Sequence, residues 1–321
     1  MPQELKQPVS NVLVTGGAGF IGSNLVSRLV ETGHRVRVLD NFTTGHRHNL
    51  AAFADDVEII EGDIQSYERA HTAVRDIEVV FHEAAMPSVP RSVQDPLTST
   101  AVNVTGTLNV MLASRDAGVR RVVFASSSSV YGTNPSLPKH EDLVPQPFSP
   151  YAVAKLAGEG YCRTFNAIYG LETVALRYFN VFGPQQDPGS QYAAVIPKFV
   201  LAALHGTRPT VYGDGEQTRD FTFVENVVAA NVLAMNAPEG AGETMNVACG
   251  ERISLNRLLE VVGELTGGPL EAEYMERRAG DVRHSHAAIA LAAEKLGYQC
   301  LVDFRDGLAR TIDYYRSLAS S

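Results

Sequence analysis

Residues 9–22 read VSNVLVTGGAGFIG, a short apolar run that ends in a turn rich in glycine. The apolar run, Val9–Thr15, predicts a buried strand. The residues after the turn, Phe20–Thr32, repeat apolar side chains three and four positions apart, and this spacing predicts a helix. A strand that leads through glycines into a helix is typical of the first unit of a parallel sheet that binds a nucleotide.

Three glycines of the turn, Gly16, Gly19 and Gly22, follow one another at intervals of three residues. Glycine permits the tight turn and lets backbone N–H groups approach a pyrophosphate at the start of the helix. Asp40, at the end of the next expected strand, can accept hydrogen bonds from the ribose hydroxyls of NAD and would repel the 2′-phosphate of NADP. We therefore expect NAD as the cofactor. Asp63, in the sequence EGDI, is either a contact to the adenine edge or an ordinary turn residue.

The first half of the chain alternates strand-like and helix-like segments. Helical spacing recurs in Leu97–Ala117 and in Pro150–Tyr169. This alternation predicts an α/β fold with a parallel sheet that is covered by helices on both faces. The further strands expected are Arg35–Asp40, Val57–Ile60, Ile77–His82, Val122–Ser126 and Thr173–Tyr178.

After about residue 180 the alternation breaks, and proline and glycine punctuate the chain. We therefore expect two domains: residues 1–180 bind the dinucleotide, and residues 181–321 form a smaller mixed α/β substrate domain. The boundary is soft, because later strands could return to the first sheet. Helices are expected in the second half at Tyr192–Leu204, Val224–Met235, Leu255–Leu265 and Arg305–Leu318.

Composition argues against several classes of protein. The 321 residues include 27 Lys and Arg against 36 Asp and Glu, a net charge of −9, so we expect no general nucleic-acid binder. We find no apolar run long enough to span a membrane and expect no secretory signal. The three cysteines, Cys162, Cys249 and Cys300, are scattered and indicate thiols in a reducing cytosol. We therefore expect a cytoplasmic protein.

Tyr151 and Lys155 lie one turn apart on the same face of the expected helix Pro150–Tyr169. A lysine cation, together with a positive nicotinamide, favours the phenolate form of a tyrosine. The pair can therefore act as a general base toward a sugar or alcohol hydroxyl. The serine run at residues 126–129 directly follows a predicted buried strand, and a hydroxyl there can bridge a substrate oxygen and Tyr151.

Taken in order, the motifs GGAGFIG, HEAA, SSSSVYG, SPYAVAKLAGE, LRYFNVFGP and GDGEQTRDF resemble those of the extended short-chain dehydrogenase/reductases that act on nucleotide sugars. The resemblance extends from about Val9 to Tyr315 and is strongest to the UDP-sugar 4-epimerases, including UDP-N-acetylglucosamine 4-epimerases. It implies a Rossmann-type doubly wound parallel sheet. It also implies NAD-dependent, reversible inversion at C4 of a UDP-hexose through a 4-keto intermediate. A homodimer formed through Leu97–Ala117 and Pro150–Tyr169 is implied as well.

The resemblance also implies roles for individual residues. Arg219 and Arg278 suit the diphosphate, because guanidinium groups make charge-assisted contacts with phosphate oxygens. Ser285 is implied to face the C2 substituent of the hexose, where a serine leaves room for an N-acetyl group. The implied catalytic residues are Ser127, Tyr151 and Lys155. The implied cofactor-binding residues are Gly16, Gly19, Phe20, Ile21, Gly22, Asp40, Asn41, Asp63, Ile64, Ala84, Asn103, Lys155 and Tyr178. The implied substrate-binding residues are Ser128, Asn180, Ala194, Val195, Lys198, Tyr212, Arg219, Arg278, Asp281 and Ser285.

At some positions the sequence departs from the motifs of related enzymes, and these departures narrow the range of reactions that we expect. Sugar-nucleotide 4,6-dehydratases carry an Asp-Glu pair where this chain has Ser128 and Ser129, so elimination of water lacks its acid and base. The histidines at 46, 48, 284 and 286 have no cysteine or carboxylate at ligand spacing, and we expect no metal. Two alternatives stay open: a UDP-glucuronic acid 4-epimerase, and a non-catalytic NAD-responsive binding protein of the same superfamily.

Overall fold

The computed structural model describes residues 9–188, 194–277 and 283–319. Its centre is a parallel sheet of seven strands in the order β11-β6-β5-β4-β1-β2-β3. This order confirms the predicted α/β fold with a doubly wound parallel sheet. The strands are β1 (Asn11–Thr15), β2 (Arg35–Asp40), β3 (Val57–Glu61), β4 (Val79–His82), β5 (Arg121–Ser127), β6 (Glu172–Tyr178) and β11 (Thr244–Val247).

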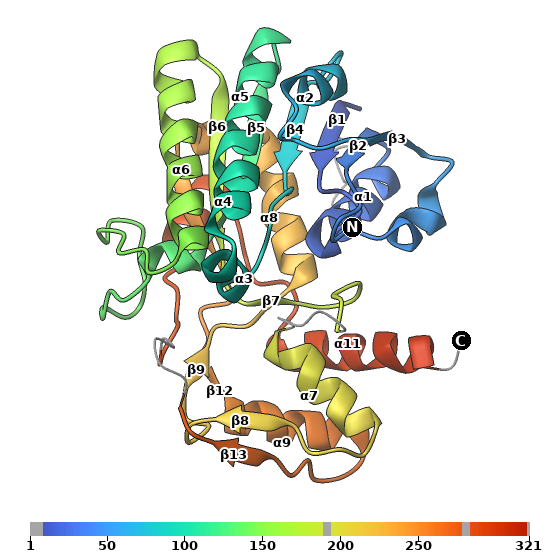
Figure 1. Cartoon of the computed structure of the whole chain (residues 1–321), viewed down its shortest axis with the longest axis vertical. Coiled ribbons are helices and arrows are strands. Elements are labelled where there is room, and N and C mark those ends of the chain that lie inside the picture. Colours follow the sequence, from blue (N-terminus) through green and yellow to red (C-terminus); the bar gives the residue numbers. More distant parts are fainter. Residues whose placement is uncertain (1–8, 189–193, 278–282, 320–321) are drawn as a thin grey trace.

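Helices cover both faces of this sheet (Figure 1). Three of them, α2 (Tyr67–Ala73), α5 (Thr107–Asp116) and α6 (Pro150–Tyr169), pack side by side on one face. On the other face, α1 (Phe20–Glu31) packs against α8 (Val224–Asn236). Two apolar clusters fill the space between the helices and the sheet, as expected for strands that are buried on both faces.

The expected helix Leu97–Ala117 is three consecutive pieces in the structure. It consists of α4 (Pro96–Thr100), a π-helical stretch at Ala101–Gly106, and α5. The Asp95 side chain caps the start of α4 by accepting a hydrogen bond from the Thr98 N–H, 3.0 Å away. Just before it lies α3 (Val89–Gln94), which the sequence pattern did not predict.

The helix α6 has the predicted bounds, Pro150–Tyr169, because its ends carry clear signals. Ser149 Oγ accepts a hydrogen bond from the Ala152 N–H, 3.1 Å away, and Pro150 fits the first turn, where no intrahelical N–H bond is needed. Gly170 ends the helix with φ +69°, a left-handed conformation that glycine adopts without strain.

A buried ion pair joins α6 to β6. Glu159 accepts two hydrogen bonds of 2.8 Å from Arg177, one on each carboxylate oxygen, and its side chain is only 2% exposed. Ser126 Oγ donates a third, 2.5 Å long, to the same carboxylate. Arg177 also donates to Tyr131 Oη at 2.8 Å. These bonds fix α6 against the ends of β5 and β6, next to Ser127.

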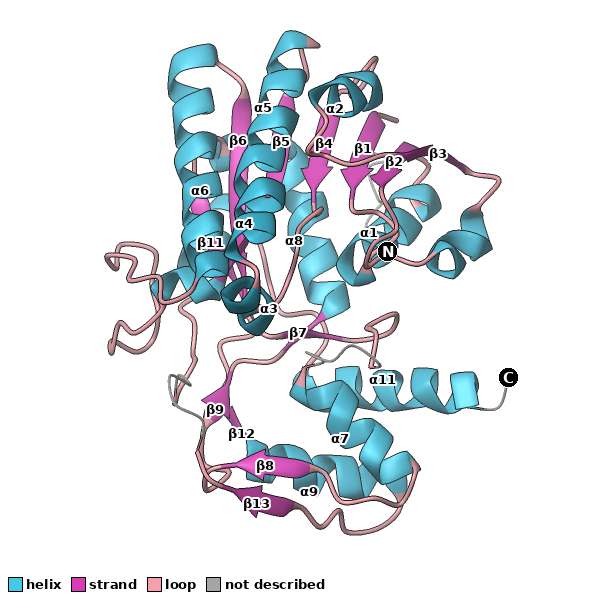
Figure 2. Cartoon of the chain, viewed as in Figure 1, coloured by secondary structure: helices cyan, strands magenta, loops and turns pink. Residues whose placement is uncertain are grey.

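The second half of the chain contributes to two layers. β11 pairs with β6, α8 covers the sheet and α10 (Ala290–Leu296) packs against both, so these parts of the chain return to the first layer, while the short strand pairs and the helices after them form a smaller layer beside it (Figure 2). The domain boundary at residue 180 stays a prediction. No helix within the described residues is long and apolar enough to cross a membrane.

The elements of either layer that have not yet been given are short strand pairs, short helices and three longer helices. The strand pairs are β7 (Val181–Phe182) with β10 (Thr222–Phe223), β8 (Thr210–Tyr212) with β13 (Glu273–Met275), and β9 (Thr218–Arg219) with β12 (Ile253–Ser254). The longer helices are α7 (Val195–Leu204), α9 (Leu255–Thr266) and α11 (Phe304–Ala319), and the short ones are the 3-10 turns Arg47–Phe53, Ser128–Tyr131 and Pro238–Gly240.

Candidate active site

The glycine turn between β1 and α1 has no room for side chains. A Cβ on Gly22 would lie 2.2 Å from the Gly16 carbonyl oxygen, and a Cβ on Gly16, where φ is +71°, would lie 2.7 Å from the Ala84 backbone. Gly19 begins α1 without a side-chain cap, so the N–H groups of the first turn, at Phe20 and Ile21, face no capping side chain. An uncapped helix start behind a bare backbone turn fits the pyrophosphate of a dinucleotide.

Acidic side chains follow β2 and β3 at the same edge of the sheet. Asp40 is buried and accepts backbone hydrogen bonds from Ala18 at 2.9 Å and from Phe42 at 2.8 Å, one on each oxygen. Each carboxylate oxygen keeps a lone pair for a further donor, such as a ribose hydroxyl. Asn41 Nδ2 donates to Asp63 Oδ2 at 2.8 Å, so these two predicted cofactor residues adjoin each other.

Ser127, Tyr151 and Lys155 come together where β5 ends against α6. The Ser127 hydroxyl lies close enough to the Tyr151 phenol to lower its pKa. Lys155 is buried, its Nζ donates to the Ala125 carbonyl at 2.7 Å, and it lies 5.8 Å from the centre of the Tyr151 ring. The structure therefore groups the three predicted catalytic side chains.

Burial shifts the pKa values of both Tyr151 and Lys155. Burial raises the pKa of Tyr151 to about 12, against the lowering effect of the Ser127 hydroxyl. Burial also lowers the pKa of Lys155 to about 8. Below about pH 8 Lys155 carries a positive charge, 5.8 Å from the centre of the Tyr151 ring, and such a charge favours the phenolate. That the lysine cation and a positive nicotinamide together favour the phenolate stays a prediction.

Glu83, directly after β4, is a site residue to which the sequence analysis gave no role. Its Oε1 accepts a hydrogen bond from Tyr178 Oη at 2.7 Å, and Asn231 Nδ2 on α8 donates to the same Oη at 2.8 Å. Burial raises the pKa of Glu83 to about 7, opposed by the Tyr178 hydrogen bond and the charge of Lys155. The carboxylate in turn raises the pKa of both Tyr151 and Lys155.

This coupling predicts the effect of Glu83→Gln on the pH dependence of turnover. Above pH 7 Glu83 is charged and favours the cationic form of Lys155, so removing that charge makes Lys155 lose its proton at lower pH. We expect the alkaline limb of the kcat–pH profile to move down by about one pH unit. Glu58→Gln, which changes an exposed carboxylate paired with Arg37, is the matched control. An unchanged or upward-shifted limb in Glu83→Gln would contradict the coupling.

The other predicted cofactor residues lie around the same sheet edge. Ala84 N–H donates to Thr15 Oγ1 at 3.3 Å beside the glycine turn, and Ile64 is buried after β3. Asn103 is buried in the π-helical stretch, and its amide bonds the Met86 backbone at 2.8 and 3.1 Å. Its side chain therefore holds the loop after β4 in place.

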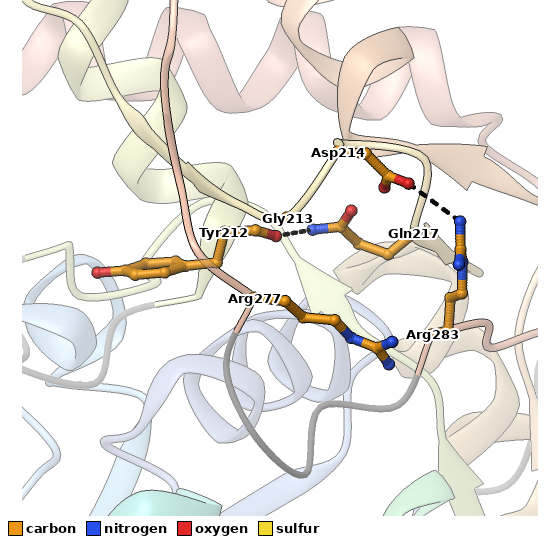
Figure 3. A pocket seen from close by; sticks show the side chains of 6 residues that line it. All are labelled: Tyr212, Gly213, Asp214, Gln217, Arg277 and Arg283. Carbon is orange, nitrogen blue, oxygen red and sulfur yellow. Dashed lines mark hydrogen bonds and ion pairs between the residues drawn. The ribbon is translucent and has the colours of Figure 1, made fainter.

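A pocket of about 180 Å³ lies in the smaller layer (Figure 3). Two arginines give it positive charge, and one of them, Arg283, pairs with Asp214 at 3.0 Å. Gln217 Nε2 donates to the Tyr212 carbonyl at 2.6 Å, which holds the turn that closes one side. The lining residues are Tyr212, Gly213, Asp214, Gln217, Arg277 and Arg283.

The predicted substrate residues are only partly gathered around this pocket. Tyr212 lines it. Arg219 on β9 donates to the Arg283 carbonyl at 3.2 Å. The half-buried Ser285 donates its N–H to the Thr218 carbonyl at 3.0 Å. Arg219 and Ser285 therefore lie on backbone next to the pocket residue Arg283. Arg278 and Asp281 lie outside the described residues.

Other predicted substrate residues lie on separate elements. Asn180 follows β6 with φ +36° and donates to the Asp220 carbonyl at 3.1 Å, and Ser128 begins the 3-10 turn after β5. Ala194 and Val195 start α7, and Lys198 is exposed on the same helix. Gln217, Arg277 and Arg283 also line the pocket and were not predicted from the sequence; the turn sequence GDG and the doubled arginine at 277–278 were the available signals.

The sheet, the bare glycine turn and the Ser-Tyr-Lys group define an enzyme that binds a dinucleotide and acts on a hydroxyl group. Comparison with known proteins agrees: the model of the NAD dependent epimerase/dehydratase family matches residues 12–248. The chain belongs to this family, which confirms the resemblance found in the sequence and NAD as the cofactor.

Three relatives are similar over nearly their whole length. UDP-glucose 4-epimerase of Mycolicibacterium smegmatis is 42% identical over 309 residues, which are 95% of this chain and 98% of that protein. The structure of UDP-N-acetylglucosamine 4-epimerase from Methanobrevibacter ruminantium, in complex with UDP-N-acetylmuramic acid, has TM-score 0.93 at 39% identity, covering 97% of this chain and 100% of that one. UDP-glucose 4-epimerase of Thermotoga maritima with UDP-glucose has TM-score 0.92 at 38% identity, covering 96% and 99%.

Proposed function

We propose that this protein catalyses reversible inversion at C4 of a UDP-hexose. The observation that carries the proposal is the group of Ser127, Tyr151 and Lys155 at the end of β5, on the sheet edge that also holds the glycine turn. The position after Ser127 supports an epimerase over a dehydratase, because Ser128 and Ser129 supply no carboxyl group for elimination of water.

The chain's own residues account for the proton steps. NAD, when bound, supplies the acceptor and donor for the hydride of C4. Tyr151 Oη removes the proton of the C4 hydroxyl, and the Ser127 hydroxyl shares that hydrogen bond. After the 4-keto sugar has turned about its phosphate linkage and presents the opposite face of C4 for return of the hydride, the same Tyr151 returns the proton to the C4 oxygen. One base therefore serves both directions.

The diphosphate of the substrate is assigned to the arginines of the smaller layer. Arg277 and Arg283 line the pocket and Arg219 adjoins it, and guanidinium groups suit phosphate oxygens. Asp214 pairs with Arg283 and leaves the pocket with a net positive lining. Arg278 and Asp281 stay predicted substrate residues.

A panel of nucleotide sugars tests the proposal. The pure protein is incubated separately with UDP-glucose, UDP-N-acetylglucosamine and UDP-glucuronic acid, and the products are resolved by anion-exchange chromatography. We expect conversion of at least one substrate to its C4 epimer, with no net consumption of NAD. If none of the three is converted while the protein retains NAD, the non-catalytic alternative replaces this proposal.

We further propose a cytoplasmic homodimer. Large apolar side chains are exposed on neighbouring helices: Val93 on α3 is 62% exposed, Leu97 on α4 is 83% exposed and Val153 on α6 is 53% exposed. A second copy of the chain that covers this surface would remove their apolar area from water. Light scattering of the full chain and of Leu97→Glu tests the proposal, and a monomeric wild type would contradict it.

The size of the sugar that the protein accepts as substrate is predicted to depend on Ser285. The segment that carries Ser285 lies along β9, next to Arg219. We expect Ser285→Tyr to lower kcat/KM for UDP-N-acetylglucosamine by about 10–100-fold, because a large side chain in a closed pocket costs a bulky ligand about 1–3 kcal/mol. UDP-glucose, measured on both proteins, is the internal control. Equal losses for both sugars, or no loss for either, would show that Ser285 does not face the C2 substituent.

A further inference from the structure

The fold brings together two cysteines that are far apart in the sequence. Cys249 follows β11, and Cys300 lies between α10 and α11. The same buried amide holds both: Asn226 Nδ2 on α8 donates to Cys249 Sγ and to Cys300 Sγ, each at 3.4 Å. The sulfur atoms therefore lie within about twice that distance of each other. Cys300 Sγ also donates to the Val302 carbonyl at 3.3 Å.

Their surroundings make the two thiols unequal. The neighbouring Cys249 thiol lowers the pKa of Cys300, and Cys300 in turn raises the pKa of Cys249. Both cysteines are half-buried. Cys162 differs in each respect, because it is buried and burial raises the pKa of its thiol. Thiolate character and exposure govern which cysteine is oxidised.

The backbone around the pair is held independently of the sulfur atoms. Asn226 Oδ1 accepts from the N–H groups of Leu301 and Val302 at 2.8 and 3.0 Å, and the Cys249 N–H donates to the buried Asp220 at 3.1 Å. The two chain segments are thus held beside each other whatever the oxidation state of the thiols. A disulfide requires the two sulfur atoms to approach each other to about 2.0 Å.

We propose that Cys249 and Cys300 form a reversible disulfide when the protein meets a peroxide. The Cys300 thiolate attacks one peroxide oxygen, the O–O bond breaks, and the leaving oxygen takes up a proton to become water, which leaves a sulfenic acid on Cys300. Cys249 Sγ then attacks that sulfur, the S–S bond forms, the S–O bond breaks, and the hydroxyl leaves as a second water with the thiol proton of Cys249. Two thiols are oxidised by two electrons, and one peroxide is reduced to two waters.

The disulfide joins the ends of a functional segment. Residues 249–300 include Arg277 and Arg283, which line the pocket, and Ser285 beside β9. In the reduced protein the chain near the two ends of this segment is held together by hydrogen bonds through Asn226 and by the bond from Tyr298 Oη to the Ala248 carbonyl, 2.9 Å long. Oxidation would add a covalent link between these ends.

Mass spectrometry of the full chain tests the proposal. The protein is reduced, freed of reductant, treated with hydrogen peroxide, alkylated under denaturing conditions and mapped by peptide. We expect one intrachain link between Cys249 and Cys300, reversed by dithiothreitol, while Cys162 is alkylated as a free thiol. In Cys249→Ser, Cys300 is expected to stop at a sulfenic acid that dimedone traps, and Cys300→Ser is expected to form no intrachain link.

Two results would overturn the proposal, and both can be read on the wild-type chain. One is that Cys249 and Cys300 keep free thiols at a peroxide dose that oxidises glutathione. The other is that they end as separate sulfinic acids or as links between chains. The wild-type peptide map decides the question even where a serine variant fails to fold.

Discussion

Tyr151→Phe is expected to bind UDP-sugar almost as tightly as the wild type and to turn over about 10²–10⁴-fold more slowly. The ring stays in place beside Lys155 and only the hydroxyl is lost, so the substrate loses its base but little of its binding surface. Isothermal titration with UDP-sugar measures the binding, and the rate of C4 inversion measures turnover. A near-wild-type rate would remove Tyr151 from the mechanism.

Tyr67→Phe is the matched control for this experiment. Tyr67 lies on α2, and its hydroxyl donates to Asp116 at 2.7 Å, away from the Ser127 group. We expect its turnover to equal that of the wild type. A comparable loss in both variants would mean that removal of any tyrosine hydroxyl disturbs the protein and that the role of Tyr151 is not specific.

Glu159→Gln is expected to lower the free energy of unfolding by about 3–5 kcal/mol, because removing one partner of a buried ion pair leaves the other charge uncompensated. Arg177 is only 5% exposed and would keep its charge beside a neutral amide that cannot accept both of its hydrogen bonds equally. Ser126 Oγ also loses its charged acceptor. Urea denaturation followed by circular dichroism measures the loss.

Glu225→Gln supplies the comparison for an exposed pair. Glu225 accepts from Arg310 at 2.7 Å, but the two side chains are 53% and 52% exposed. Water screens such pairs, and we expect a loss of about 0–1 kcal/mol. Similar losses in Glu159→Gln and Glu225→Gln would show that burial of the Glu159 pair adds nothing to stability.

The parts of the fold that the sequence predicts are those with local signals. β2 and α6 have the predicted bounds, because alternation of apolar residues marks β2 and a serine cap, a proline and a terminal glycine mark α6. β11 was not assigned, because its four residues, TMNV, carry no periodic pattern and its partner β6 lies far away in the chain. Pairing between distant segments is decided by packing, which no local pattern reports.

The residues of the candidate site also divide into those with local sequence signals and those whose contacts come from distant parts of the chain. Motif spacing placed Ser127, Tyr151 and Lys155 together, because one helix and one strand end carry all three. The role of Glu83 was not visible, because its contacts come from Tyr178 on β6 and Asn231 on α8. The same holds for Cys249 and Cys300, which looked scattered until Asn226 was seen to hold both. Residue types were readable from the sequence, and partners across the fold were not.

The position of β11 at the edge of the central sheet has a consequence for synthesis on the ribosome. The strand β6 emerges first and presents a row of unpaired backbone groups until its neighbour Thr244–Val247 has been made. Roughly 70 further residues are needed, which takes several seconds at about 5–20 residues per second. During that interval the nascent chain exposes an open strand edge, to which another nascent chain or a chaperone can bind. A truncated chain that ends near residue 180 keeps that edge permanently and is therefore prone to aggregate.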